Sequence, residues 1–110
     1  MDLSNLKNDP LQLASFIHQA ALNPFLSDEL LNQLCNGAKK LNISRICTNL
    51  IRLEKTKELL GSKSDTKLIA VIAFPFGNIP QEFKKSEAEW SVNQGADELD
   101  IVPNVLALIQ

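Results

Sequence analysis

The sequence lacks the features that would direct it to a membrane or to a nucleic acid. No apolar run approaches the ~20 residues of a membrane helix, and no basic start precedes an apolar stretch at the N-terminus. Basic residues gather only as Lys39 with Lys40 and Lys84 with Lys85, and the formal net charge is -2. We therefore expect a cytoplasmic protein whose partners are neither nucleic acids nor membranes.

Cysteine and histidine are also scarce, with two and one residues respectively. Cys35 and Cys47 do not have the spacing of zinc ligands, so we expect no metal site. A disulfide between them is disfavoured in a reducing compartment. Low-complexity segments and interdomain linkers are absent, and 45% of the residues are hydrophobic. The chain is therefore expected to form one domain over residues 1–110, although a partial one for the reasons given below.

Apolar runs and helical stripes alternate along the chain. Strands are predicted at 43–48, 68–74 and 98–102, each followed or preceded by a helical pattern. Ser27 has the position of a helix cap, and glycines at 61 and 95 end the next two helices. Near the N-terminus, Asp9 and Pro10 begin a helix that apolar spacing alone would extend over 11–21.

The spacing also predicts which helical residues are buried or paired. One stripe of the helix after Ser27 is apolar and should face the core; it consists of Leu30, Leu31, Leu34, Cys35, Ala38 and Leu41. A second stripe joins Ile79, Phe83 and Trp90. Two charge pairs are expected on helix surfaces, Glu54 with Lys57 and Lys84 with Glu87.

Strands recur at intervals of about 25 to 30 residues, as they do in successive βα units, whose connections are parallel and right-handed. The expected fold class is α/β, with about four βα units. Four units are about half of an eight-fold (β/α)8 barrel, which usually needs ~250 residues. Residues 107–110 fall inside the next predicted helix, which suggests a fragment.

The carboxyl ends of the strands are where parallel barrels place their active sites. The segments to consider are 18–23, 47–49, 74–78 and 100–104. In the last strand, alternation puts Leu99 and Ile101 on one face and Asp100 on the other, which is the interior if helices cover the Leu99 face. An interior carboxylate needs either a partner or a chemical role, so a buried ion pair is the alternative to catalysis.

An ordered series of motifs resembles the deoxyribose-phosphate aldolase family. The series is VIAFPFGN at 71–78, then Lys84, then Glu87 with Ala88, then GADELDIV at 95–102 and Asn104. The resemblance implies that the chain is the first half of a TIM-type (β/α)8 barrel. Members of the family reversibly cleave 2-deoxy-D-ribose 5-phosphate into glyceraldehyde 3-phosphate and acetaldehyde through a lysine imine. The resemblance implies no metal or organic cofactor, a role in deoxyribonucleotide catabolism, and an N-terminal helix that ends near Phe16 before a strand.

The resemblance also implies roles for several residues. Asp100 matches the aspartate that transfers protons and tunes the Schiff-base lysine. Cys47 and Asn49, in ICTN, match a strand that lines the substrate pocket, although Cys47 is equally expected as a core residue and has no sign of an activated thiolate. Asn104 is either a pocket amide or a helix cap.

The opening strand departs from the family pattern, with IHQAALNP where the family has IDHTLLKP. His18 replaces the family's aspartate, so it is a pocket candidate as a new acid or base, or else a structural histidine. Ala20 and Asn23 replace a threonine and a lysine, which puts the substrate in question.

The imine-forming lysine is also missing. The chain has nine lysines and none ends a strand: Lys7, Lys39, Lys40, Lys55, Lys57, Lys63, Lys67, Lys84 and Lys85. In the family this lysine belongs to the second half of the barrel, so we expect that the chain cannot form an imine alone. The expected partners are a small phosphosugar or aldehyde and further copies of the chain. The alternatives are a non-catalytic half-barrel that associates with itself or a partner, and a class I aldolase of different substrate.

Overall fold

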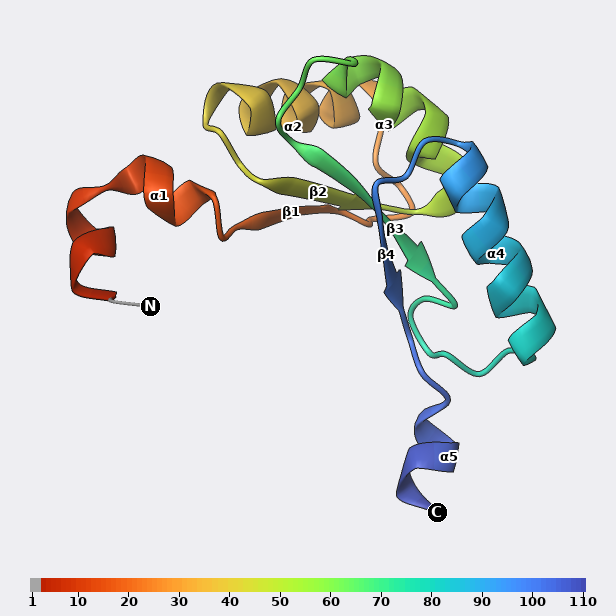
Figure 1. The fold of residues 1–110 in the computed structure, drawn as a ribbon. Helices are drawn as coiled ribbons and strands as arrows, with labels where there is room; N and C mark the ends of the chain where they lie inside the picture. Colours follow the sequence, from red (N-terminus) through yellow and green to blue (C-terminus); the bar gives the residue numbers. More distant parts are fainter. Residues whose placement is uncertain (1–2) are drawn as a thin grey trace.

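The computed structural model describes residues 3–110, which form a single four-stranded parallel sheet with helices (Figure 1). The strands are β1 (His18–Ala21), β2 (Arg45–Thr48), β3 (Lys67–Ile72) and β4 (Glu98–Ile101). Their order in the sheet is β1-β2-β3-β4, and each strand pairs with the next in parallel. The predicted α/β class is confirmed, and the arrangement is that of four consecutive βα units of a barrel.

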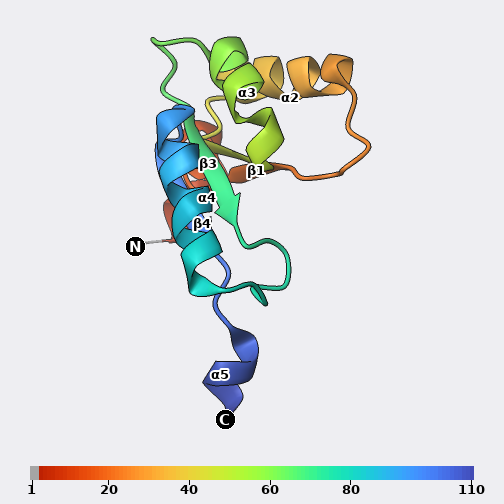
Figure 2. The same ribbon diagram turned by 90° about the vertical axis from the view of Figure 1, so that its right-hand side faces the viewer.

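Helices connect the strands and cover one side of the sheet. The longer ones are α2 (Asp28–Lys40), α3 (Leu53–Leu60) and α4 (Gln81–Asn93), and Figures 1 and 2 show all three on the same side. The shorter elements are η1 (Leu3–Asn8), α1 (Pro10–Ala14), η2 (Leu50–Arg52) and α5 (Val105–Ile109). α5 projects away from the sheet in both views. Between residues 3 and 110, no helix combines the length and hydropathy needed to cross a membrane.

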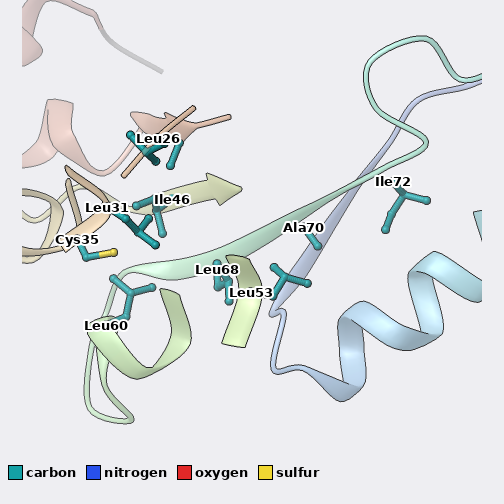
Figure 3. Close-up of a cluster of buried hydrophobic side chains, with 10 residues drawn as sticks. Leu26, Leu31, Cys35, Ile46, Leu53, Leu60, Leu68, Ala70 and Ile72 are labelled. Carbon is teal, nitrogen blue, oxygen red and sulfur yellow. The ribbon is translucent and has the colours of Figure 1, made fainter. Parts of the chain in front are cut away.

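The main core lies between the sheet and these helices. Leu31 and Cys35 of α2 meet Ile46 of β2, Leu53 of α3 and Leu68 of β3, and all five are fully buried or nearly so (Figure 3). A smaller cluster covers the opposite face of the sheet and consists of Cys47, Ile69 and Val71, with Leu22 packed against it. β3 is therefore buried on both faces, as its unbroken apolar run predicts.

We call the side of the sheet that faces away from the helices the inner face. It carries His18 and Ala20 of β1, Arg45 and Cys47 of β2, Ile69 and Val71 of β3, and Glu98 and Asp100 of β4. In a closed barrel this face would be the interior. Here it is partly open, and Asp100 and Ile101 at its β4 side are exposed.

Most of the predicted boundaries are confirmed to within two residues. The Ser27 side chain accepts the N–H of Leu30 at 3.2 Å, which confirms it as the cap of α2. Gly61 and Gly95 end their helices with φ of 81° and 100°. The helix predicted over 11–21 from apolar spacing is wrong, because α1 ends at Ala14. β1 follows because its backbone pairs with β2, a long-range interaction that overrides local helical periodicity.

Two predicted apolar stripes need correction. Leu31, Cys35 and Ala38 of α2 are buried, but Leu30 and Leu41 remain 49% and 61% exposed. Leu30 and Leu41 lie on either side of the contact between α2 and the sheet, because the sheet touches only a narrow side of the helix. The second correction concerns α4, where Phe83 and Trp90 are 55% and 44% exposed. Its sheet-facing residues are instead Lys84, Glu87, Ala88 and Ser91, of which Ser91 is fully buried.

Neither predicted surface charge pair forms. Lys57 pairs with Asp97 at 3.2 Å rather than with Glu54, because α3 lies against the turn that precedes β4. Lys84 and Glu87 turn toward the backbone of the strand ends instead of toward each other. Both corrections have one cause: a partner distant in sequence competes better than a neighbour on the same exposed helix, where ion pairs contribute little.

Candidate functional site

Two adjoining hollows lie where the carboxyl ends of the strands converge, the place that barrel topology predicts for a site. The first has a volume of about 380 Å³ and lies on the inner face. It is lined by Leu22, Cys47, Val71, Phe74, Asp100, Ile101 and Val102. The second has a volume of about 450 Å³ and lies over the ends of the first three strands. It is lined by Leu22, Asn23, Pro24, Asn49, Ile51, Arg52, Phe74 and Pro75. Leu22 and Phe74 belong to both and separate them.

Asp100 provides the carboxylate of the first hollow. It lies on the inner face beside Val71 of β3, as the alternation of β4 predicts. Within residues 3–110 it makes no ion pair, and its side chain is exposed at the open side of the half barrel. A buried ion pair that serves stability alone therefore does not account for Asp100 in this structure.

Cys47 faces Asp100 across the first hollow and remains a protonated thiol. Burial, together with the nearby charge of Asp100, raises its pKa to about 11. Burial likewise raises the pKa of Cys35 in the core. Both cysteines are free. Because a thiol attacks as its thiolate, Cys47 at neutral pH shapes the hollow rather than acting as a nucleophile.

Side chains at the end of β2 hold the end of β1 in place. The Asn49 amide donates to the Leu22 carbonyl at 3.2 Å, and the hydroxyl of buried Thr48 donates to the Ala21 carbonyl at 3.0 Å. Leu22 is thereby fixed between the two hollows. Asn49 thus holds the Leu22 backbone in position, and it also lines the second hollow, as the resemblance implies.

The loop between β3 and α4 forms the far wall of both hollows, and α4 braces it. The backbone N–H of Ala73, a residue with φ of 56°, donates to the Glu87 carboxylate at 2.8 Å. The Lys84 ammonium donates to the Val102 carbonyl at 2.9 Å, just beyond β4. Gly77 lies so close to Pro103 that a Cβ there would fall 2.1 Å from the Pro103 carbonyl oxygen. Glu87 and Lys84 thus connect the loop to the strand that carries Asp100.

Neither this brace nor an ion pair on the inner face was predicted from the amino-acid sequence. Arg45 of β2 donates to both carboxylate oxygens of Glu98 of β4, at 3.0 and 2.6 Å, across the intervening β3. For the brace there was no local signal, because the i, i+3 spacing of Lys84 and Glu87 fits an exposed ion pair equally well. For Arg45 and Glu98, the only signal was that both are charged residues on predicted inward faces.

Two candidate residues lie outside the hollows. His18 is at the amino end of β1, opposite Arg45, so the length of the strand separates it from the carboxyl ends. Asn104 accepts the N–H of Ala107 at 3.4 Å and is the cap of α5, the second of the two roles considered for it. The structure therefore brings Cys47, Asn49 and Asp100 to the site, but neither His18 nor Asn104.

Known proteins match this chain by sequence and by fold, although no protein-family model does. It is 38% identical over 98 residues to the deoxyribose-phosphate aldolase of Thermococcus kodakarensis and 36% identical over 101 residues to that of Treponema denticola. These matches cover 88% and 91% of the chain, but only 44% and 46% of the relatives.

The solved tetrameric deoxyribose phosphate aldolase of Aeropyrum pernix superposes with a TM-score of 0.84 at 31% identity, over 94% of the chain and 44% of that protein. The chain thus spans less than half the length of the relatives it matches. By sequence and by fold, the chain is similar to the N-terminal half of these deoxyribose-phosphate aldolases.

Proposed function

We propose that residues 1–110 form a partial barrel domain that supplies one half of a deoxyribose-phosphate aldolase active site. The reaction is the reversible cleavage of 2-deoxy-D-ribose 5-phosphate into glyceraldehyde 3-phosphate and acetaldehyde. It proceeds through an imine on a lysine that lies outside these residues. The observation that carries the proposal is the unpaired Asp100 carboxylate beside the inner hollow, within a motif series shared with aldolases.

Asp100 would move the protons of this reaction. Once the substrate carbonyl at C1 has formed an imine, the bond between C2 and C3 breaks as the hydroxyl on C3 loses its proton and becomes the aldehyde of glyceraldehyde 3-phosphate. The electron pair of that bond enters the imine and leaves an enamine, which must later gain a proton at carbon. Asp100 lines the first hollow, and we expect its carboxylate to accept the first proton and to return one.

The remaining residues of the hollows would shape the pocket and orient the substrate. Cys47 contributes a neutral thiol wall, since its pKa of about 11 keeps it protonated. Asn49 fixes the rim through Leu22. His18 and Asn104 stay candidates for the pocket only if the completed barrel brings substrate to them. Because His18, Ala20 and Asn23 differ from the family pattern, a related aldehyde or phosphosugar is the second candidate substrate.

None of the lysines described here is available for imine formation at a strand end. Lys67 begins β3, at the opposite end from the hollows. Lys84 donates to the Val102 carbonyl, Lys57 pairs with Asp97, and Lys39 donates to the Leu59 carbonyl. An imine lysine must be desolvated and neutral, which none of these contacts favours.

We propose that the functional assembly acts in the cytoplasm.

The test is a chimera in which residues 1–110 replace the matching part of the Thermococcus kodakarensis aldolase. We expect it to cleave 2-deoxy-D-ribose 5-phosphate and to gain a borohydride-reduced substrate adduct, seen by intact mass. The isolated chain should gain none. In the chimera, Asp100→Asn should lower kcat about 100-fold or more.

Asp97→Asn is the matched control, because Asp97 lies before β4 at the far end from the hollows and pairs with Lys57. It should leave kcat of the chimera unchanged. A reduced adduct on the isolated chain would contradict the missing lysine. A chimera that folds but retains full kcat after Asp100→Asn would contradict the role of Asp100. A preference for unphosphorylated deoxyribose would favour the second candidate substrate.

A further inference from the structure

Both edges of the sheet are unpaired within residues 3–110. β1 pairs only with β2, and β4 pairs only with β3, so each has one side of backbone N–H and C=O groups without a strand partner. Apolar side chains accompany these edges: Ile17 precedes β1, Ile101 ends β4, and all of α5 is exposed. An exposed edge of this kind is a template for another strand.

The inner face also holds half of a charged layer. In a closed eight-stranded barrel, four side chains from alternate strands fill one layer of the interior. Arg45 and Glu98 come from β2 and β4, which are alternate strands, and they meet across β3 with both side chains only partly buried. They therefore supply one positive and one negative member of such a layer. Two of the four members of the layer are lacking. A second pair of one arginine and one glutamate would complete the layer and keep its net charge at zero.

We propose that a second copy of this chain occupies both free edges and closes an eight-stranded barrel about a two-fold axis. In each of two identical seams, β4 of one copy pairs in parallel with β1 of the other. Two copies supply eight strands, and each copy matches about 44% of the length of complete relatives. The layer then contains two arginines and two glutamates in alternation, which is the charge complementarity that selects a second copy.

The register of the seam follows from the stagger that the chain already shows. Arg45 lies opposite Lys67, whereas Glu98 lies opposite Ile69, two residues farther along β3. The same stagger across the seam brings Glu98 to the Arg45 of the second copy. It also sets Asp100 opposite the second copy's His18, so a carboxylate and an imidazole meet at each seam. The seam thereby pairs two exposed polar residues that have no such partner within residues 3–110.

This assembly and the proposed aldolase function exclude each other at any one moment. The second copy brings no lysine to the carboxyl end of a described strand, and it occupies the edges that the rest of an aldolase barrel would need. The inference therefore does not rest on the proposed function. Failure of the chimera would leave the dimer standing, and failure of the dimer would leave the chimera standing.

The experiment uses the charge-reversed variant R45E/E98R, which keeps the pair within each chain. We expect the wild type to sediment at about twice 12.2 kDa as its concentration rises through the micromolar range, and the reversed variant to do the same. When isotope-labelled wild type is mixed with the reversed variant, one seam of a heterodimer would bring glutamate against glutamate, and the other would bring arginine against arginine. Native mass spectrometry should then find heterodimers below about one tenth of all dimers, against one half for statistical mixing.

K85E/E89K is the matched control, because this pair on α4 is exposed and lies on the outer side of the sheet. It should mix statistically with the wild type. If the reversed variant fails to fold, amide exchange of the wild type at low and high concentration replaces the mixing, with protection expected to rise in β1 and β4. A monomer at every concentration would overturn the proposal and leave a covalent remainder as occupant of the edges. Statistical mixing with the reversed variant, or protection confined to the helices, would overturn it as well.

Discussion

At the scale of the single residue, Asp97 connects three segments at the amino end of the sheet. Its carboxylate accepts the N–H of Leu68 at 2.9 Å and pairs with Lys57 of α3. Partial burial alone would raise its pKa, but the Leu68 N–H and the Lys57 ammonium outweigh burial and lower it below the ordinary value. Because the folded state holds the carboxylate more strongly ionised than the unfolded chain does, the stabilisation from the Asp97 charge is complete above the ordinary carboxyl pKa and is lost as the pH falls through the lowered native pKa.

We therefore predict that Asp97→Asn lowers the free energy of unfolding by about 1–2 kcal/mol at pH 7. The difference from the wild type should shrink as the pH falls below about 4, where the unfolded carboxyl takes up its proton, and disappear once the pH has fallen through the lower pKa of the native carboxyl. Urea unfolding followed by the fluorescence of Trp90, the single tryptophan, measures both effects. A cost that is the same at pH 3 as at pH 7 would show that the Asp97 charge is not the cause.

Cys47 offers a second prediction at this scale. With a pKa of about 11, its thiolate fraction at pH 8 is about 100-fold below that of an ordinary thiol. We expect iodoacetamide to alkylate Cys47 correspondingly slowly in the folded chain and at an ordinary rate in urea, as followed by peptide mass mapping. Alkylation of the native protein at the rate of a small free thiol would contradict the burial of this side chain.

At the scale of the element, α4 differs from an ordinary amphipathic helix because its sheet-facing side is polar. Glu87 accepts the N–H of Ala73, a residue that is itself buried, and Ser91 is fully buried one turn further on. The phenyl and indole rings of Phe83 and Trp90 point away from the core. The helix is thus held partly by hydrogen bonds to a loop and a strand end rather than by an apolar stripe.

Removing the Glu87 carboxylate should leave the buried Ala73 N–H without an acceptor. We predict that Glu87→Ala lowers the free energy of unfolding by about 1–3 kcal/mol, and that Glu87→Gln, which keeps an acceptor oxygen, lowers it by less. Glu89→Ala is the control and should change it by no more than about 0.5 kcal/mol, since Glu89 is exposed. Urea unfolding distinguishes the three variants. Equal effects of Glu87→Ala and Glu89→Ala would mean that the brace contributes nothing.

The elements also show where sequence reasoning succeeded and where it failed. The cap at Ser27, the glycine stop at Gly95 and the apolar run of β3 are local signals, and each marked an element correctly. The Glu87 brace could not be predicted in the same way, because its partner is a backbone N–H fourteen residues away in an irregular loop. Likewise Arg45 and Glu98 are 53 residues apart, and only the curvature of the sheet brings them together.

The candidate site likewise contains residues that local patterns placed correctly and one that they did not. Alternation along β4 placed Asp100 on the inner face, and barrel topology placed Cys47 and Asn49 at the hollows. His18 was selected because it aligns with a family residue, yet it lies at the other end of β1. Alignment identifies a position in a strand, but the height of that position along the barrel depends on the strand register. The register is fixed by pairing with β2, which the sequence alone does not reveal.

At the scale of the whole molecule, burial is unevenly distributed among the elements. β3 is central in the sheet and buried on both faces, whereas every residue of α5 is exposed. We predict that amide exchange at low concentration is slowest in β3 and fastest in α5, with the edge strands between them. Mass spectrometry of peptides from quenched exchange measures this order. Slow exchange of α5 at low concentration would mean that it packs against a surface that the structure leaves open.

The common direction of β1 and β4 has a consequence for how association can be blocked. Because both strands run the same way, each free edge is complementary to the other, so two seams are available to one pair of molecules. Once one seam has formed, the second pair of edges meets at an effective concentration of about millimolar, and ring closure outcompetes growth into an open chain. Because every seam needs one β1 edge and one β4 edge, blocking either edge on all molecules removes both seams. A single extended peptide that pairs with β4 should be enough to keep the molecules apart.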